Sequence, residues 1–128
     1  AVLQAALFMS GHISVMTVLR KEIDMKDQLL KLAGEIIRLC DKILENETSP
    51  NSDVIRLIKR EFEAQCDSLI KENKVIVLNN NHELWAVRTL YDSAFFEYDQ
   101  NLFQKVFEFA KICKHLKQSE VIIRYPNG

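Results

Sequence analysis

Apolar residues recur along this chain at spacings of three and four, the period of amphipathic helices, in four successive segments. The clearest stripe runs from about Met25 to Glu47, and the next occupies about residues 54–72. A third lies within residues 82–98, and the last extends from Gln100 to about Lys117. The pattern therefore predicts four helices. Their short connections favour an antiparallel, up-and-down arrangement of neighbours.

Two short runs depart from the helical period. Residues 75–78 and 121–125 are rich in β-branched side chains and are bounded by polar residues or proline, which is typical of strands. Pairing of the two would add a small two-stranded β ribbon, a structure that is marginal unless it packs against other elements. The expected fold class is therefore mainly all-α, an antiparallel bundle of four to five helices with this ribbon.

The fifth helix is expected at the N-terminus. Residues 1–19 contain no charged side chain when His12 is counted as neutral. The run approaches the length of a membrane span, but polar residues interrupt it and it lacks the positively charged start of a secretory signal. We expect residues 1–24 to form an apolar helix buried against protein. Part of this segment can also precede a natural start at Met9, Met16 or Met25.

The segment from Met25 onward already contains enough helices to close a bundle. The apolar stripe of residues 1–24 is therefore predicted to be buried on a second copy of the chain, because large apolar patches are rarely left in water. Closed twofold dimers are the commonest outcome of such burial, so a homodimer is expected.

Composition fits one globular domain over residues 1–128, since 48% of the residues are hydrophobic and 27% charged. The 17 Lys and Arg nearly balance the 18 Asp and Glu, which leaves no global field to attract nucleic acid. The three cysteines are odd in number and form no CxxC pair, which fits a reduced, cytoplasmic setting.

Few residue patterns for catalysis or cofactor binding occur. With three glycines the chain cannot build a phosphate loop, a dinucleotide-binding turn or a nucleophile elbow. Each cysteine lies on an apolar stripe and is predicted to be a small buried hydrophobe. The histidines are scattered, and Cys113 and His115 point to different helix faces, so neither a metal nor another cofactor is expected.

The segment of residues 82–98 is the most distinctive part of the chain. It holds the only tryptophan, Trp85, one turn before Arg88, which in turn lies one turn before Asp92. An Arg88–Asp92 ion pair and a contact of the indole with the guanidinium group follow from this spacing. Tryptophan and arginine are enriched at interface hot spots. The predicted partner-binding residues are Asn80, Asn81, His82, Trp85, Arg88 and Asp92.

The stripes also predict which side chains form the core. On the segment of residues 82–98 the inward positions are Leu84, Val87, Tyr91, Ala94, Phe95 and Tyr98. A single core is expected to contain Ile36, Ile37, Phe62, Leu69, Phe95, Phe103 and Phe107. Gly34 predicts a close crossing of a neighbouring helix. The basic cluster of Arg56, Lys59 and Arg60 is interpreted as a solvated face offset by Glu61 and Glu63.

The function expected from these features is non-enzymatic protein binding with self-association. One alternative, based on size and helix order, is a small helical immunity protein that neutralises a bacterial toxin. Another is an enzyme with an unfamiliar polar site around Arg88 and Asp92. A deep polar cleft that also contains His82 would favour the enzyme, whereas an exposed flat face at Trp85 would favour binding.

Overall fold

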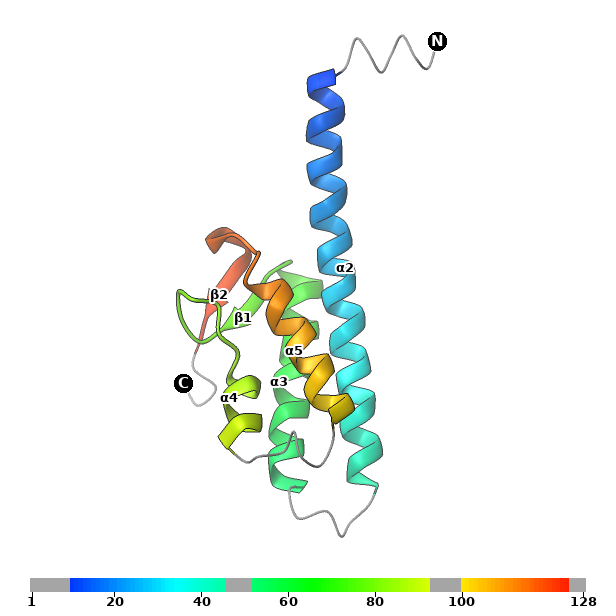
Figure 1. Ribbon diagram of the computed structural model, residues 1–128, viewed down its shortest axis with the longest axis vertical. Coiled ribbons are helices and arrows are strands. Elements are labelled where there is room, and N and C mark those ends of the chain that lie inside the picture. The colour runs from blue at the N-terminus through cyan, green and yellow to red at the C-terminus, as the bar shows by residue number, and fades with distance from the viewer. Residues whose placement is uncertain (1–9, 46–51, 93–99, 125–128) are drawn as a thin grey trace.

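The computed structural model describes residues 10–45, 52–92 and 100–124, and for residues 10–24 it describes the backbone. The described chain is mainly helical with a small two-stranded parallel sheet (Figure 1). The elements are α2 (Ser10–Leu44), α3 (Ser52–Lys71), β1 (Val75–Val77), α4 (Trp85–Asp92), α5 (Gln100–Cys113), the 3-10 helix η2 (Gln118–Glu120) and β2 (Val121–Ile123). Residues 46–51 and 93–99 lie outside the described residues. The second range includes Ala94, Phe95 and Tyr98, three of the inward positions predicted for the segment of residues 82–98.

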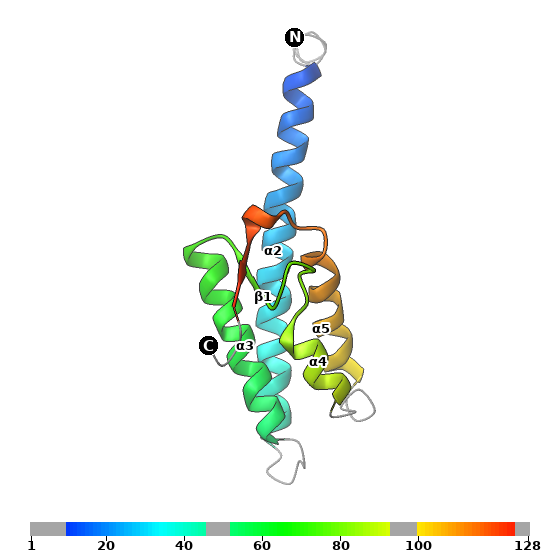
Figure 2. The same cartoon turned by 90° about the vertical axis from the view of Figure 1, so that its left-hand side faces the viewer.

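The long helix α2 replaces two elements expected from the sequence. Residues 10–24 of the apolar N-terminal segment and the helix predicted from Met25 form one continuous helix, because no proline or turn signal separates them. Both views show the first part of α2 extending alone past the other elements (Figures 1 and 2). Met25 is the first residue of α2 seen to pack on the core, among those whose side chains are described.

Gly34 does not mark a close helix crossing. A Cβ built on it would meet Arg38 Nη2 of the same helix at 4.0 Å, which is ordinary van der Waals contact. The prediction of a neighbouring helix at this point is therefore wrong.

The core lies where α2 packs against α3 and α5, with α4 closing it against α5 and α3. Its largest fully buried side chains include Phe62 and Phe109, whose rings meet edge to face with centroids 5.1 Å apart. Ion pairs join α2 to its neighbours at the surface, Asp41 to Lys59 and Glu35 to Lys105. Because these pairs are partly exposed, the apolar core holds the helices together.

The two predicted strands do pair, but in parallel. Val75 lies opposite Val121 and Val77 opposite Ile123, and the Arg124 N–H extends the ladder to the Val77 carbonyl at 2.9 Å. A parallel pair needs a long crossover, and α4, α5 and η2 supply it. The expected fold is therefore confirmed at the level of a mainly helical chain with a small sheet.

Gln65 of α3 closes the other edge of β1. Its side-chain amide donates to the Ile76 carbonyl at 2.7 Å and accepts from the Ile76 N–H at 2.8 Å, so it pairs with the strand as another strand would. Ser68, one turn further along α3, donates to the Lys74 carbonyl at 2.7 Å. Although it is polar, Gln65 is fully buried because this pairing satisfies both ends of its amide.

The inward faces of α4 and α5 differ from those predicted. α4 buries Ala86 and Leu90, while Tyr91 is 53% exposed. On α5, Phe109 is buried and Phe107 is 38% exposed. The core prediction is correct for Ile36, Phe62 and Leu69 and wrong for Phe107. In the structure, Ile37 and Phe103 lie at the margin of the core. Two adjacent apolar stripes occupy α5, and its packing against α2 buries the one that contains Phe109.

Candidate functional site

The connection from β1 to α4 is a turn built around Asn79. The side-chain oxygen of Asn79 accepts from the backbone N–H of Asn81 at 3.0 Å, and its carbonyl accepts from the N–H of His82 at 3.0 Å. The Leu78 N–H donates to the Glu83 carbonyl at 2.8 Å, closing the loop at its base. An asparagine that bonds backbone groups two and three residues ahead is a common turn nucleus. The turn therefore fixes where α4 begins.

His82 is held inside this turn. It adopts a left-handed backbone with φ of 58°, and its side chain is buried. Its Nδ1 lies 2.9 Å from the carbonyl oxygen of Cys113, the last residue of α5, so the imidazole donates there and satisfies a carbonyl at a helix end. Its Nε2 is buried with no hydrogen-bond partner among the described residues. The structure thus places His82 inside the molecule, away from the surface offered to a partner.

The surface part of the predicted site lies on the turn and on α4. Asn80, Asn81, Arg88 and Asp92 are exposed, and Trp85, the first residue of α4, is half-buried. The Asn80 carbonyl also accepts from Gln118 Nε2 at 3.1 Å, which ties the turn to η2.

Arg88 has a different partner from the one predicted. Its Nη2 lies 3.0 Å from Glu83 Oε2, and the same oxygen accepts from Asn79 Nδ2 at 3.2 Å. The expected pair with Asp92 is not among the ion pairs of the described residues. The turn explains the change, because it brings Glu83 back against the first turn of α4. The pair is largely exposed and therefore contributes little to stability.

An aromatic strip crosses from α4 to α5. The sequence analysis did not predict it, because its rings were assigned to the core. The rings of Tyr91 and Phe103 meet edge to face with centroids 5.4 Å apart, and those of Phe103 and Phe107 stack at 5.9 Å. The Lys111 ammonium lies 5.0 Å from the centre of the Phe107 ring, within cation–π range. We call Tyr91, Phe103, Phe107 and Lys111 the aromatic strip. Spacing alone could have suggested it, since Phe103, Phe107 and Lys111 recur every four residues.

Glu61 of α3 is a buried carboxyl that the sequence did not single out. Burial raises its pKa from 4.5 to about 8, and the backbone N–H groups of Ala86 and Trp85, at the start of α4, lower it in part. Its Oε2 is buried without a hydrogen-bond partner among the described residues. The interpretation of Glu61 as part of a solvated face is therefore wrong. Its position in the sequence could have predicted this burial, because Glu61 lies about one helical turn from both Ile58 and Gln65, which face inward.

The cysteines match the sequence prediction. Cys40 and Cys113 are buried and Cys66 is half-buried, all as thiols. Burial raises the pKa of the Cys113 thiol strongly, and the charge of Glu61 raises it further. Such a thiol is a poor nucleophile because its reactive thiolate form is disfavoured. In the part of the chain that the structure describes, no three Cys, His, Asp or Glu side chains come together as metal ligands.

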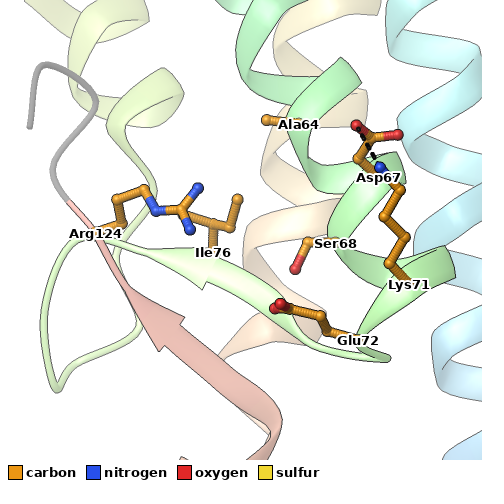
Figure 3. Close-up of a pocket in the computed structure, with 7 residues that line it drawn as sticks. All are labelled: Ala64, Asp67, Ser68, Lys71, Glu72, Ile76 and Arg124. Atoms are coloured by element: carbon orange, nitrogen blue, oxygen red, sulfur yellow. Dashed lines mark ion pairs between the residues drawn. The ribbon is translucent and has the colours of Figure 1, made fainter.

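A small pocket of about 190 Å³ opens between α3 and the sheet (Figure 3). Asp67 and Lys71, an ion pair at 3.8 Å, lie on its α3 side, and Arg124 faces them from the end of β2. The remaining lining residues are Ala64, Ser68, Glu72 and Ile76. Two cations and two carboxylates balance each other here, and the volume is below the usual range for small-molecule sites.

Comparisons with models of known protein families, with curated proteins and with solved structures find no match for this chain. No helix among the described residues combines the length and the apolarity needed to cross a membrane.

Proposed function

We propose that the protein is a non-enzymatic protein-binding helical module that associates with a second copy of itself through residues 1–24. The observation that carries this proposal is the first part of α2, which extends alone past the rest of the fold (Figures 1 and 2). An isolated helix of this length is marginal in water, since helices gain most of their stability from packing. Its sequence has no charged residue before Arg20, so its exposure to water is unfavourable.

Light scattering tests this self-association directly. The full chain and a version that begins at Met25 are compared at equal concentrations. The proposal expects a dimer for the first and a folded monomer for the second, because the backbone of the first part of α2 extends past the rest of the fold (Figures 1 and 2). A full-length protein that is monomeric contradicts the proposal. A shortened protein that stays dimeric also contradicts it and moves the interface elsewhere.

A point substitution keeps the length of the chain constant. Val18 lies on the apolar stripe predicted for the N-terminal segment, whereas the neighbouring Thr17 lies off it. We expect Val18→Glu to weaken the dimer at least tenfold, since a buried unpaired charge is costly. Thr17→Glu is the matched control and should leave the dimer intact.

The proposed surface for a different protein partner is the turn and α4, together with the aromatic strip. Asn80, Trp85, Arg88 and Asp92 reach this surface, and the exposed Tyr91 and Phe107 adjoin it. Large rings beside cationic side chains are the chemistry enriched in interface hot spots. His82, also predicted for binding, supports the surface from inside.

Affinity capture from the native source, followed by mass spectrometry, tests this surface through variants. Arg88→Ala and Phe107→Ala should each lose a protein that the unmodified chain retains, with the free energy of unfolding lowered by about 1 kcal/mol or less, because both side chains are exposed. Arg56→Ala is the matched control. Arg56 is an exposed arginine of α3, where it pairs with Asp53 of the same helix. Equal loss in all three variants would contradict a surface on α4.

The enzyme alternative has less support. It needs Arg88, Asp92 and His82 in one polar cleft, but His82 is buried against Cys113 while the other two are exposed.

A further inference from the structure

Glu61 places a buried carboxyl against the first turn of α4. The backbone N–H groups of Ala86 and Trp85 donate hydrogen bonds to it, so a side chain of α3 satisfies donors at the start of an eight-residue helix. α3 and α4 lie in contact. The other carboxyl oxygen of Glu61, Oε2, is buried without a hydrogen-bond partner among the described residues.

Among the described residues, no Lys or Arg forms an ion pair with Glu61. From α5 its titratable neighbour is the Cys113 thiol, and from the turn before α4 the His82 imidazole reaches the carbonyl of the same cysteine through Nδ1. On α4 itself, Arg88 is held by Glu83 at the surface. The residues that α2 buries are apolar apart from the thiol of Cys40. An ionised Glu61 would thus have two backbone N–H groups as its support and no opposite charge.

We propose that loss of the proton from Glu61 is a pH-sensitive switch that loosens the first turn of α4 from α3 and exposes Trp85 to water. The cause is the cost of a buried carboxylate without a cation, which water entering between α3 and α4 relieves. The burial of Glu61 supports a transition near neutral pH, because its pKa lies at about 8. The switch concerns the position of α4 and holds whether or not α4 binds a partner.

Fluorescence reads this switch without any partner, because Trp85 is the only tryptophan and begins α4. The emission of the full chain is recorded between pH 6 and 9.5. We expect one transition to longer wavelength with a midpoint near pH 8, and we expect Glu61→Gln to abolish it, since an amide keeps the hydrogen bonds and cannot ionise. Glu63→Gln, an exposed glutamate on the same helix, is the matched control and should keep the transition.

Two further measurements make the result decisive. Cys113→Ser should retain the transition, which separates the carboxyl from the neighbouring thiol. NMR spectra should show the backbone amides of Trp85 and Ala86 titrating with the Glu61 carboxyl carbon at one midpoint. An emission that does not change with pH overturns the proposal, as does a Glu61→Gln variant that titrates like the original chain. A Glu61 carbon with a midpoint near its ordinary value also overturns it.

Discussion

A buried carboxyl makes stability depend on pH, and Glu61 sets the sign of that dependence here. Its pKa is raised from 4.5 to about 8 in the folded protein, so the folded state binds more protons than the unfolded state between these values. The free energy of unfolding therefore falls as pH rises from about 4.5 to 8 and levels off above. With about 1.4 kcal/mol per unit of pKa, the loss is on the order of 3–5 kcal/mol.

We expect Glu61→Gln to remove most of this loss. The variant should match the original protein near pH 5 and exceed it in stability at pH 8, as measured by urea unfolding at pH 5, 6, 7 and 8. Glu63→Gln should follow the original curve, because its side chain is exposed. A decline that persists unchanged in Glu61→Gln would assign the pH dependence to another group.

Phe109 and Phe107 should respond in opposite ways to truncation. Phe109 is fully buried against Phe62, so Phe109→Ala is expected to cost about 3–5 kcal/mol of unfolding free energy. Phe107 is 38% exposed, and Phe107→Ala should cost about 1 kcal/mol or less, the scale of a surface change. Denaturant unfolding of the two variants compares them, and a larger cost for Phe107 would restore the inward face predicted from the sequence.

The sequence could not separate these two residues, for a physical reason. Phe103 and Phe107 form one apolar stripe on α5, and Leu102, Val106 and Phe109 form the adjacent one. Period alone identifies an amphipathic helix, but the identity of the packed stripe depends on the neighbouring helices. Glu61 escaped notice for a similar reason, because a carboxylate within a charged run is normally solvated.

Among the elements, β1 depends on a side chain of a helix. Gln65→Ala removes both hydrogen bonds to Ile76, and we expect a cost of about 2–3 kcal/mol because two backbone groups lose their partner in a partly buried place. Gln104→Ala, at an exposed position of α5, should stay within about 0.5 kcal/mol of the original protein. Thermal and urea unfolding of both variants measures the difference.

A second substitution at the same position identifies the hydrogen bonds as the cause. Gln65→Glu keeps an acceptor for the Ile76 N–H but loses the donor to its carbonyl while the carboxyl is ionised. Protonation restores an O–H donor, so this variant should recover stability relative to the original as pH falls. A cost in Gln65→Glu that is independent of pH would indicate lost packing instead.

The elements themselves were largely predictable. All four predicted helical segments from Met25 onward contain a helix, and the two β-branched runs became β1 and β2. The direction of strand pairing was not predictable, because local sequence does not record whether α4 and α5 return the chain to the same end of the sheet. The continuity of α2 was missed because residues 1–24 and the stripe from Met25 were interpreted as separate helices.

For the whole molecule, the described core belongs to the chain from Met25 onward. Removal of residues 1–24 should therefore leave the unfolding free energy of the monomer within about 1 kcal/mol, with an unchanged denaturant slope. Urea unfolding at low protein concentration checks this separately from the oligomeric state. A large fall in the slope would show that residues 1–24 are part of the cooperative unit.

The exposure of most candidate residues agrees with the sequence analysis, their contacts do not, and their role in binding stays a prediction. The turn and α4 were identified from Trp85 and Arg88, and both reach the surface at least in part. The Arg88–Glu83 pair and the burial of His82 both follow from the turn at Asn79, which brings together groups that helical spacing keeps apart. Helical periodicity cannot describe a segment before the helix begins.

The parallel pairing of β1 with β2 has a consequence for the order in which the chain folds. Val75 and Val121 are separated in the chain by α4, α5 and η2, whereas the helices form from local contacts. Closing so long a loop carries an entropic cost that nearby packing must first repay, which makes distant strand pairs slow to form. We therefore expect the ladder between β1 and β2 to form late in folding, and its amides to be among the last to become protected from exchange during refolding.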